Sequence, residues 1–243
     1  MNLNTALLCI ALPLGLAACQ PAADPGAERA RQAAATEQAA ADMAGQFEQY
    51  YEAENWQLAK AHGDVLLAQY PESGAAASIK ERHVEASSRA NEAREAERTA
   101  ALWAYQREPQ AAGGAQISAA IYARDNVKTD DTRARPVRLI FRDHPEWGTS
   151  AYLTLETGDF DCYSGCDLKV TLDDAEPVAM DGSRPDTDEA IAMFIEDEKG
   201  LWRHAIAAEV LSIEFPVKAG GTRIATFETQ GLDPSKLPEW PQE

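Results

Sequence analysis

The feature that most limits the fold of this chain is a change of hydrophobic period near residues 111–114, Ala-Ala-Gly-Gly. Before this point the sequence is rich in Ala, Glu, Gln and Arg, and its apolar residues recur with the period of a helix. After it, apolar and polar residues alternate in short runs between turn residues, which is typical of antiparallel strands. We therefore predict an α+β chain, with a helical region over residues 28–107 and a mostly antiparallel, β-sandwich-like domain over residues 108–243.

Turn-forming residues divide the helical region into three expected helices. The first covers residues 28–53, and the second covers residues 56–70 and ends at Pro71, because proline cannot extend a helix. Ser73 suits the N-cap position of a third helix over residues 74–105.

The third expected helix carries a stripe of small side chains at near-heptad spacing. Its members are Ile79, Ala86, Ala90, Ala93 and Ala100. Small residues let two helices approach closely. The stripe therefore predicts either packing on the first two helices of the same chain, which we favour, or self-association with a second copy.

The second half contains several short runs of strand character. They lie at residues 137–141, 151–155, 168–172, 192–195, 210–217 and 223–228. One short helix is expected at residues 201–209, between two of these runs. Pro109 and the Gly-Gly pair at residues 113–114 mark the expected boundary between the two halves.

The first twenty residues form an uncharged apolar run that ends in Leu-Ala-Ala-Cys at Cys19. The run has the size of a signal-peptide core and is too short to span a bilayer, although residues 1–5 lack the usual Lys or Arg. The tetrapeptide resembles the lipobox of bacterial lipoproteins. That resemblance implies a signal peptide over residues 1–18, lipid on Cys19 and a tether over residues 19–27. The alternative is a soluble secreted protein with a chance Cys at the cleavage site.

A lipid on Cys19 would hold the protein to a membrane outside the cytoplasm. Enterobacterial lipoproteins that stay in the inner membrane have Asp after the lipidated Cys, whereas this chain has Gln20. By that analogy we expect an outer-membrane anchor that faces the periplasm. The net charge of −18 repels phosphate backbones, so nucleic acid is not an expected partner.

Two cysteines remain once Cys19 and the one inside the signal peptide are set aside. Cys162 and Cys166 would lie in a compartment where disulfides persist, so we predict a structural bridge between them. A redox-active pair would need a Cys-x-x-Cys spacing at a helix N-terminus. A zinc site would need two more ligands, and His144 and His204 are the histidines that lie nearest in sequence.

Several short segments of the second half, which follow one another at suitable spacing, carry a resemblance to a known family. They are Trp103-Ala104-Tyr105, Arg142-Asp143-His144-Pro145, Gly158-Asp159-Phe160-Asp161-Cys162, Cys166, Leu172-Asp173-Asp174, Phe194-Ile195 and Gly231-Leu232. Together they resemble an uncharacterised periplasmic domain of proteobacterial lipoproteins, and more distantly accessory lipoproteins of type VI secretion and invasion-associated proteins. The resemblance implies a β-rich binding or accessory module. In the first half, residues 54–71 resemble one tetratricopeptide-like helical hairpin, without a second copy.

Few residues stand out as candidates for chemistry. Arg142 lies midway along an apolar strand, where it is either an ion-pair partner of Asp173 or Asp174 or a contact for a ligand. Residues 181–189 are rich in oxygen ligands, as in a calcium loop, but a solvated turn is the simpler interpretation because the EF-hand spacing is missing. No histidine has metal spacing, and no nucleophile motif occurs.

These observations lead to one function and one alternative. We expect a membrane-anchored, non-enzymatic adaptor or envelope accessory protein that binds other proteins and needs no cofactor or metal. The alternative is a hydrolase that acts on an envelope polymer through paired carboxylates in the β domain. Because the sequence contains several acidic clusters, it does not single out such a pair.

Overall fold

A computed structural model describes residues 24–241 apart from residue 112 and residues 186–190. Cys19 and the expected signal peptide lie outside the described residues. The chain divides into two compact units, Met1–Ser88 and Arg89–Glu243. No helix within the described ranges is both long enough and apolar enough to cross a membrane.

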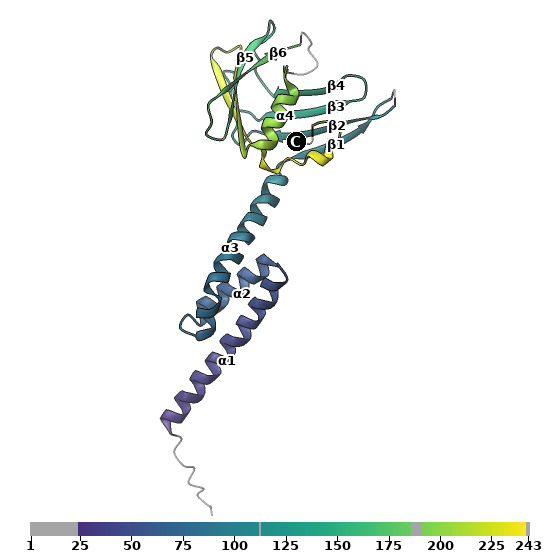
Figure 1. The fold of residues 1–243 in the computed structure, drawn as a ribbon. Coiled ribbons are helices and arrows are strands. Elements are labelled where there is room, and N and C mark those ends of the chain that lie inside the picture. Colours follow the sequence, from purple (N-terminus) through teal and green to yellow (C-terminus); the bar gives the residue numbers. More distant parts are fainter. Residues whose placement is uncertain (1–23, 112, 186–190, 242–243) are drawn as a thin grey trace, which may run out of the picture. The chain divides into compact units, whose positions relative to one another are not determined.

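Three helices begin in the first unit (Figure 1). They are α1 (Pro25–Glu52), α2 (Trp56–Gln69) and α3 (Gly74–Ala100), of which α3 continues into the second unit. Phe47 of α1, Leu66 of α2 and Ile79 of α3 are fully buried together, and alanines fill the space between them. This small core explains how Ala-rich helices stay folded, because helices of low hydrophobicity gain most of their stability from packing.

The start of α1 corrects one expectation from the sequence. Residues 19–27 were expected to be a tether, yet Pro25 and Gly26 lie in the first turn of α1, where Oδ1 of Asp24 accepts a hydrogen bond from the Gly26 N–H at 2.9 Å. Proline is tolerated there because its missing N–H would have no intrahelical partner. The predicted tether is therefore wrong from Pro25 onward, where the helix has already begun.

The expected start of the third helix and part of its stripe are confirmed. The Ser73 hydroxyl accepts a hydrogen bond from the Ala76 N–H at 3.0 Å, as an N-cap residue should. Ile79 and Ala86 belong to the core of the first unit, whereas Ala93 and Ala100 are exposed. Self-association through the exposed part of the stripe stays a prediction.

The second unit is a β domain with one inserted helix (Figure 1). Its strands are β1 (Ala104–Pro109), β2 (Ala115–Tyr122), β3 (Val137–His144), β4 (Gly148–Leu155), β5 (Cys166–Leu172), β6 (Val178–Ser183), β7 (Ala192–Ile195), β8 (Val210–Pro216) and β9 (Thr222–Glu228). Helix α4 (Glu198–Ala207) connects β7 to β8, and the short helices η1 (Thr229–Gly231) and η2 (Pro234–Lys236) follow β9. The α+β class and the antiparallel pairing are confirmed.

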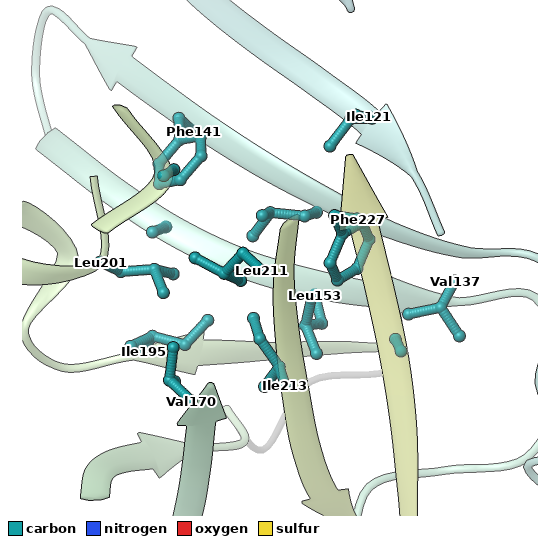
Figure 2. Packing of buried hydrophobic residues seen from close by; sticks show 14 of the residues in the cluster. Ile121, Val137, Phe141, Leu153, Val170, Ile195, Leu201, Leu211, Ile213 and Phe227 are labelled. Atoms are coloured by element: carbon teal, nitrogen blue, oxygen red, sulfur yellow. The ribbon is translucent and has the colours of Figure 1, made fainter. Parts of the chain in front are cut away.

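The strands form one continuous sheet in the order β1-β2-β3-β4-β7-β6-β5-β8-β9. The sheet curls on itself, since the Arg124 N–H just after β2 donates to the Thr226 carbonyl of β9 at 2.7 Å. Its two parts therefore enclose one core, as a sandwich would. Figure 2 shows Leu211 and Ile213 of β8 and Phe227 of β9 gathered with Leu153 of β4 in this core.

The N-terminal boundary of the β domain differs from the sequence prediction. The helical region was expected to reach residue 107, but α3 ends at Ala100 and residues 104–109 form β1. Two tertiary contacts fix this segment. The Tyr105 hydroxyl accepts a hydrogen bond from the Asp233 N–H at 2.7 Å, and Gly231 approaches the backbone of Thr99 so closely that a Cβ there would lie 2.1 Å from it. Pairing with β2 thus overrides local helix propensity.

Cys162 and Cys166 are joined by a disulfide that closes a tight loop before β5. Gly165 has a φ of 88°, a left-handed conformation that glycine adopts without strain. The loop is fastened to the end of β6, because the Arg184 N–H donates to the Cys162 carbonyl at 2.9 Å. The predicted bridge is therefore present, and it fixes where β5 begins.

Replacing both Cys162 and Cys166 by Ala should lower the free energy of unfolding of the second unit by about 2 kcal/mol, the loop-closure entropy of a short loop. Urea denaturation followed by circular dichroism measures the change. Ser164→Ala in the same exposed loop is the control and should change stability by less than about 0.5 kcal/mol. Equal stability of the double variant and the control would show that the bridge does not constrain the unfolded chain.

Candidate functional site

The outer surface of strands β2, β3, β4 and β7 carries the candidate site. Side chains alternate along a strand, so the neighbours of the core residues point outward. Ile140 of β3, Tyr152 of β4 and Phe194 of β7 are register partners and form one row across the strands. The Tyr152 and Phe194 rings lie 5.1 Å apart, and Ile140 is only 9% exposed. The partly exposed rings of Tyr152 and Phe194 therefore form the accessible part of this apolar row.

Arg142 lies beside this row, close to two aromatic rings. The carbon at the centre of its guanidinium lies 5.3 Å from the ring centre of Tyr152 and 5.5 Å from that of Trp147. Its Nε–H donates to the Ser150 hydroxyl at 3.1 Å. Cation–π attraction and this hydrogen bond together hold the guanidinium in place.

Arg138 lies on the other side of the same row, with its guanidinium 5.5 Å from the ring centre of Tyr122. Burial raises the pKa of the Tyr152 hydroxyl, while the charges of Arg142 and Arg138 oppose that rise and the charge of Glu108 adds to it. The positive charges of Arg142 and Arg138 therefore both act on the Tyr152 hydroxyl.

Trp147 lies in the turn between β3 and β4 and is 66% exposed, although its ring is held in place. The ring stacks on the buried His144 ring, with 3.9 Å between centroids and 10° between planes. Nδ1 of His144 in turn accepts the backbone N–H groups of Glu146 and Trp147 at 3.2 and 3.3 Å. A large aromatic ring is thus presented to solvent with little freedom left to lose on binding.

Trp147 and His144 line a cleft of about 440 Å³ together with Gln110, Gly113 and Glu146 from the β1–β2 and β3–β4 turns. We call this the Trp147 cleft. The larger surface is defined by five side chains and is named the arginine–aromatic face. Its members are Arg138, Arg142, Trp147, Tyr152 and Phe194.

The structure does not bring Arg142 to the acids that the sequence suggested. Asp173 has a φ of 47° after the end of β5, and its Oδ1 accepts the N–H groups of Glu209 and Val210 at 3.0 and 2.9 Å. It therefore organises the start of β8, and Asp174 beside it is exposed. Within the described ranges Arg142 forms no ion pair with either, so the ion-pair hypothesis is wrong and the ligand-contact hypothesis stays open.

An open hollow of about 580 Å³ lies over β5, β6 and β7 and is lined by Asp167, Asp181 and Glu196. Asp167 and Asp181 are register partners, and the Ser183 hydroxyl donates a hydrogen bond to Glu196. The described residues contain no group of three or more ligands that could hold a metal ion. The calcium-loop hypothesis for residues 181–189 depends partly on residues 186–190, which lie outside the described residues.

A separate charged cluster joins the disulfide loop to two neighbouring segments. The Asp159 carboxylate accepts hydrogen bonds from Arg184 at 2.8 Å and from the Tyr163 hydroxyl at 2.8 Å, and it pairs with Lys218 at 3.0 Å. Burial would raise the pKa of Asp159, but these three partners outweigh it and lower the pKa to about 2. Because every polar group here has a partner within the domain, the cluster is structural.

Comparison of the chain with protein-family models, with curated protein sequences and with solved structures finds no match. Any function must therefore be argued from the site itself. The arginine–aromatic face offers fixed rings, two guanidinium groups and a cleft. Such a surface can bind a ligand.

Proposed function

We propose that this protein is a non-enzymatic adaptor or accessory protein of the bacterial envelope, anchored by lipid on Cys19, that binds another protein through the arginine–aromatic face. The observation that carries the proposal is the environment of Arg142. Its guanidinium contacts the rings of Trp147 and Tyr152, and within the described ranges it pairs with no carboxylate. The chain has 40 acidic and 22 basic residues, so carboxylates are plentiful. An arginine that contacts aromatic rings in place of a carboxylate keeps its charge for binding a partner protein.

The composition of the face supports protein binding. Trp, Tyr and Arg are the side chains that most often dominate the energy of protein interfaces. Trp147 and Arg142 are already held by neighbouring groups, so binding would cost little conformational entropy. The row of Ile140, Tyr152 and Phe194 adds apolar area to a surface that is otherwise polar at its rim.

The test is a comparison of captured partners. Tagged full-length protein is purified from detergent-solubilised envelopes as wild type, Arg142→Ala, Trp147→Ala and, as control, Arg203→Ala on the exposed side of α4. We expect specific partners whose recovery by mass spectrometry falls about tenfold or more in both face variants and stays unchanged in the control. Equal recovery in all four samples would contradict the proposal.

The anchor has its own prediction. Cys19→Ser should release the protein from membranes, because a serine cannot accept the thioether-linked lipid and the remaining chain would lose its hydrophobic anchor. Fractionation and intact-mass measurement of the mature N-terminus provide the readout, with Cys162→Ser as a control that keeps the lipid. Membrane retention of the Cys19 variant, together with a native mass that shows no lipid, would contradict the anchor.

The alternative function, hydrolysis of an envelope polymer, would have to use the acidic hollow. Asp167, Asp181 and Glu196 line it together, which is the observation in its favour. Purified protein would then degrade isolated envelope glycans, and Asp181→Asn would abolish that activity. Undegraded glycans in the presence of wild-type protein would leave the adaptor proposal as the better account.

A further inference from the structure

The two arginines of the face have a defined spacing. Arg138 and Arg142 lie four residues apart on the same side of β3, and residues on a strand are separated by about 3.3 Å each, which places them about 13 Å apart along the strand. Ile140 lies between them, and Tyr152 is its register partner on β4. The surface therefore presents a positive charge, an apolar centre and a second positive charge in sequence along β3.

Neither guanidinium is neutralised within the described part of the chain. Among the described residues, the side chain of Arg142 hydrogen-bonds through its Nε to Ser150, which leaves the Nη groups for another acceptor. The Nε of Arg138 is buried without a hydrogen-bond partner. Arginine binds carboxylates through pairs of N–H groups, and with Nε occupied in Arg142 and buried in Arg138 a carboxylate would bind each residue through its Nη groups.

We propose that the arginine–aromatic face recognises an extended acidic segment of a partner protein, in which two carboxylates four residues apart flank an apolar side chain. In an extended chain such carboxylates point to the same side and are about 13 Å apart, which matches the arginine spacing. The apolar side chain between them would contact the partly exposed ring of Tyr152, which lies beside the buried Ile140. This inference rests on the proposed function, because it names the chemistry of the partner at the same face.

The acidic hollow restricts how the segment lies. Ile195 is the register partner of Ala151, so Glu196 lies next to Ser150 on the outer surface, with Asp181 further along the hollow. Carboxylates of the ligand would be repelled on that side. The segment therefore runs along β3 and β4 and does not cross toward β7.

The Trp147 cleft selects the residue of the segment that lies beyond the acid at Arg142. An exposed indole ring next to a cleft of about 440 Å³ fits a flat apolar side chain, such as proline or an aromatic residue. The preferred segment therefore has an acidic residue at its first and fifth positions, an apolar residue at the third, and any residue at the second and fourth. A proline or aromatic residue lies beyond the acidic residue that binds Arg142.

A peptide array probed with the full mature chain in detergent tests this inference. The peptides carry two Glu residues two, four or six positions apart around a central Leu, with or without a proline beyond one Glu, and matched peptides carry Gln. We expect the spacing of four to bind best and to lose about tenfold or more in affinity when Glu becomes Gln, or with Arg138→Ala or Arg142→Ala. Binding should also weaken as NaCl is raised.

Three further measurements distinguish a specific loss of binding from a loss of charge or of folding. Arg142→Lys keeps the charge but not the planar guanidinium and should bind more weakly than wild type, whereas Arg203→Ala should bind as wild type does. Circular dichroism shows whether each variant is folded. Equal binding of Glu and Gln peptides, no dependence on spacing, or no binding at all would overturn the inference, as would Arg142-dependent binding to phosphatidylglycerol vesicles in place of peptides.

The two proposals can fail separately. Partners that are captured through the face but bind without acidic segments would overturn this inference and leave the proposed function intact. Capture that is insensitive to the face would overturn the proposed function, whatever the peptides do.

Discussion

Phe141→Ala is expected to lower the free energy of unfolding of the second unit by about 3–5 kcal/mol. Phe141 is fully buried on the inner side of β3. Its ring lies 5.0 Å from that of Trp202, 5.4 Å from that of Trp240 and 6.2 Å from that of Trp103, measured between centroids. Truncation would remove contacts to all three indoles at once and leave a cavity that bulky rigid rings cannot fill.

Urea denaturation followed by tryptophan fluorescence is the direct measurement, because three of the five tryptophans of the chain surround the substituted ring. Ile224→Ala is the control, since this large side chain of β9 is 58% exposed and should change stability by less than about 1 kcal/mol. A similar loss in both variants would show that Phe141 is not central to the core. Domains are stable by only about 5–15 kcal/mol, so the predicted loss is a large share of the total.

The spacing at which apolar residues recur in the sequence was enough to predict the class of the fold. Alternation at Val137, Leu139 and Phe141 predicts a strand with one buried side, and these residues do lie in the core. Alternation of apolar and polar residues was not sufficient to predict β1, because five of its six residues are exposed. The position of β1 depends instead on its pairing with β2 and on the contact between Tyr105 and Asp233. Edge strands carry little local signal, so the boundary near residue 107 could not be placed correctly.

The candidate site was only partly predictable for a related reason. Arg142 could be singled out because a charge interrupts an apolar strand, but its partners depend on register, which links it to Ser150 and brings it near Tyr152. The same alternation that buries Phe141 turns Arg142 outward, away from any core ion pair. Trp147 gave no signal in the sequence, since a tryptophan in a turn is as readily buried as exposed.

A charged cluster around Asp159 also stabilises the β domain, next to the disulfide loop. Asp159 is 20% exposed, and Arg184, which donates to it, is only 4% exposed. The pKa of Asp159 is lowered from 3.8 to about 2, where burial opposes the shift and Arg184, Lys218 and Tyr163 cause it. A carboxyl group whose pKa is lower in the folded state stabilises that state above its unfolded pKa. This contribution is about 2 kcal/mol at neutral pH and is lost as the pH falls from about 4 to 2.

Asp159→Asn should therefore lower the free energy of unfolding by about 2 kcal/mol at pH 7, because the charge-assisted hydrogen bonds from Arg184, Lys218 and Tyr163 to the carboxylate would be lost. The variant should also lose less stability than wild type between about pH 4 and pH 2, since the titrating group is gone. Asp161→Asn, two residues away and exposed, is the matched control and should follow the wild-type pH profile. Urea denaturation across this pH range measures both effects. If the Asp159 variant unfolds as wild type does at pH 7 and follows the same acid profile, the charged cluster does not contribute to the stability of the domain.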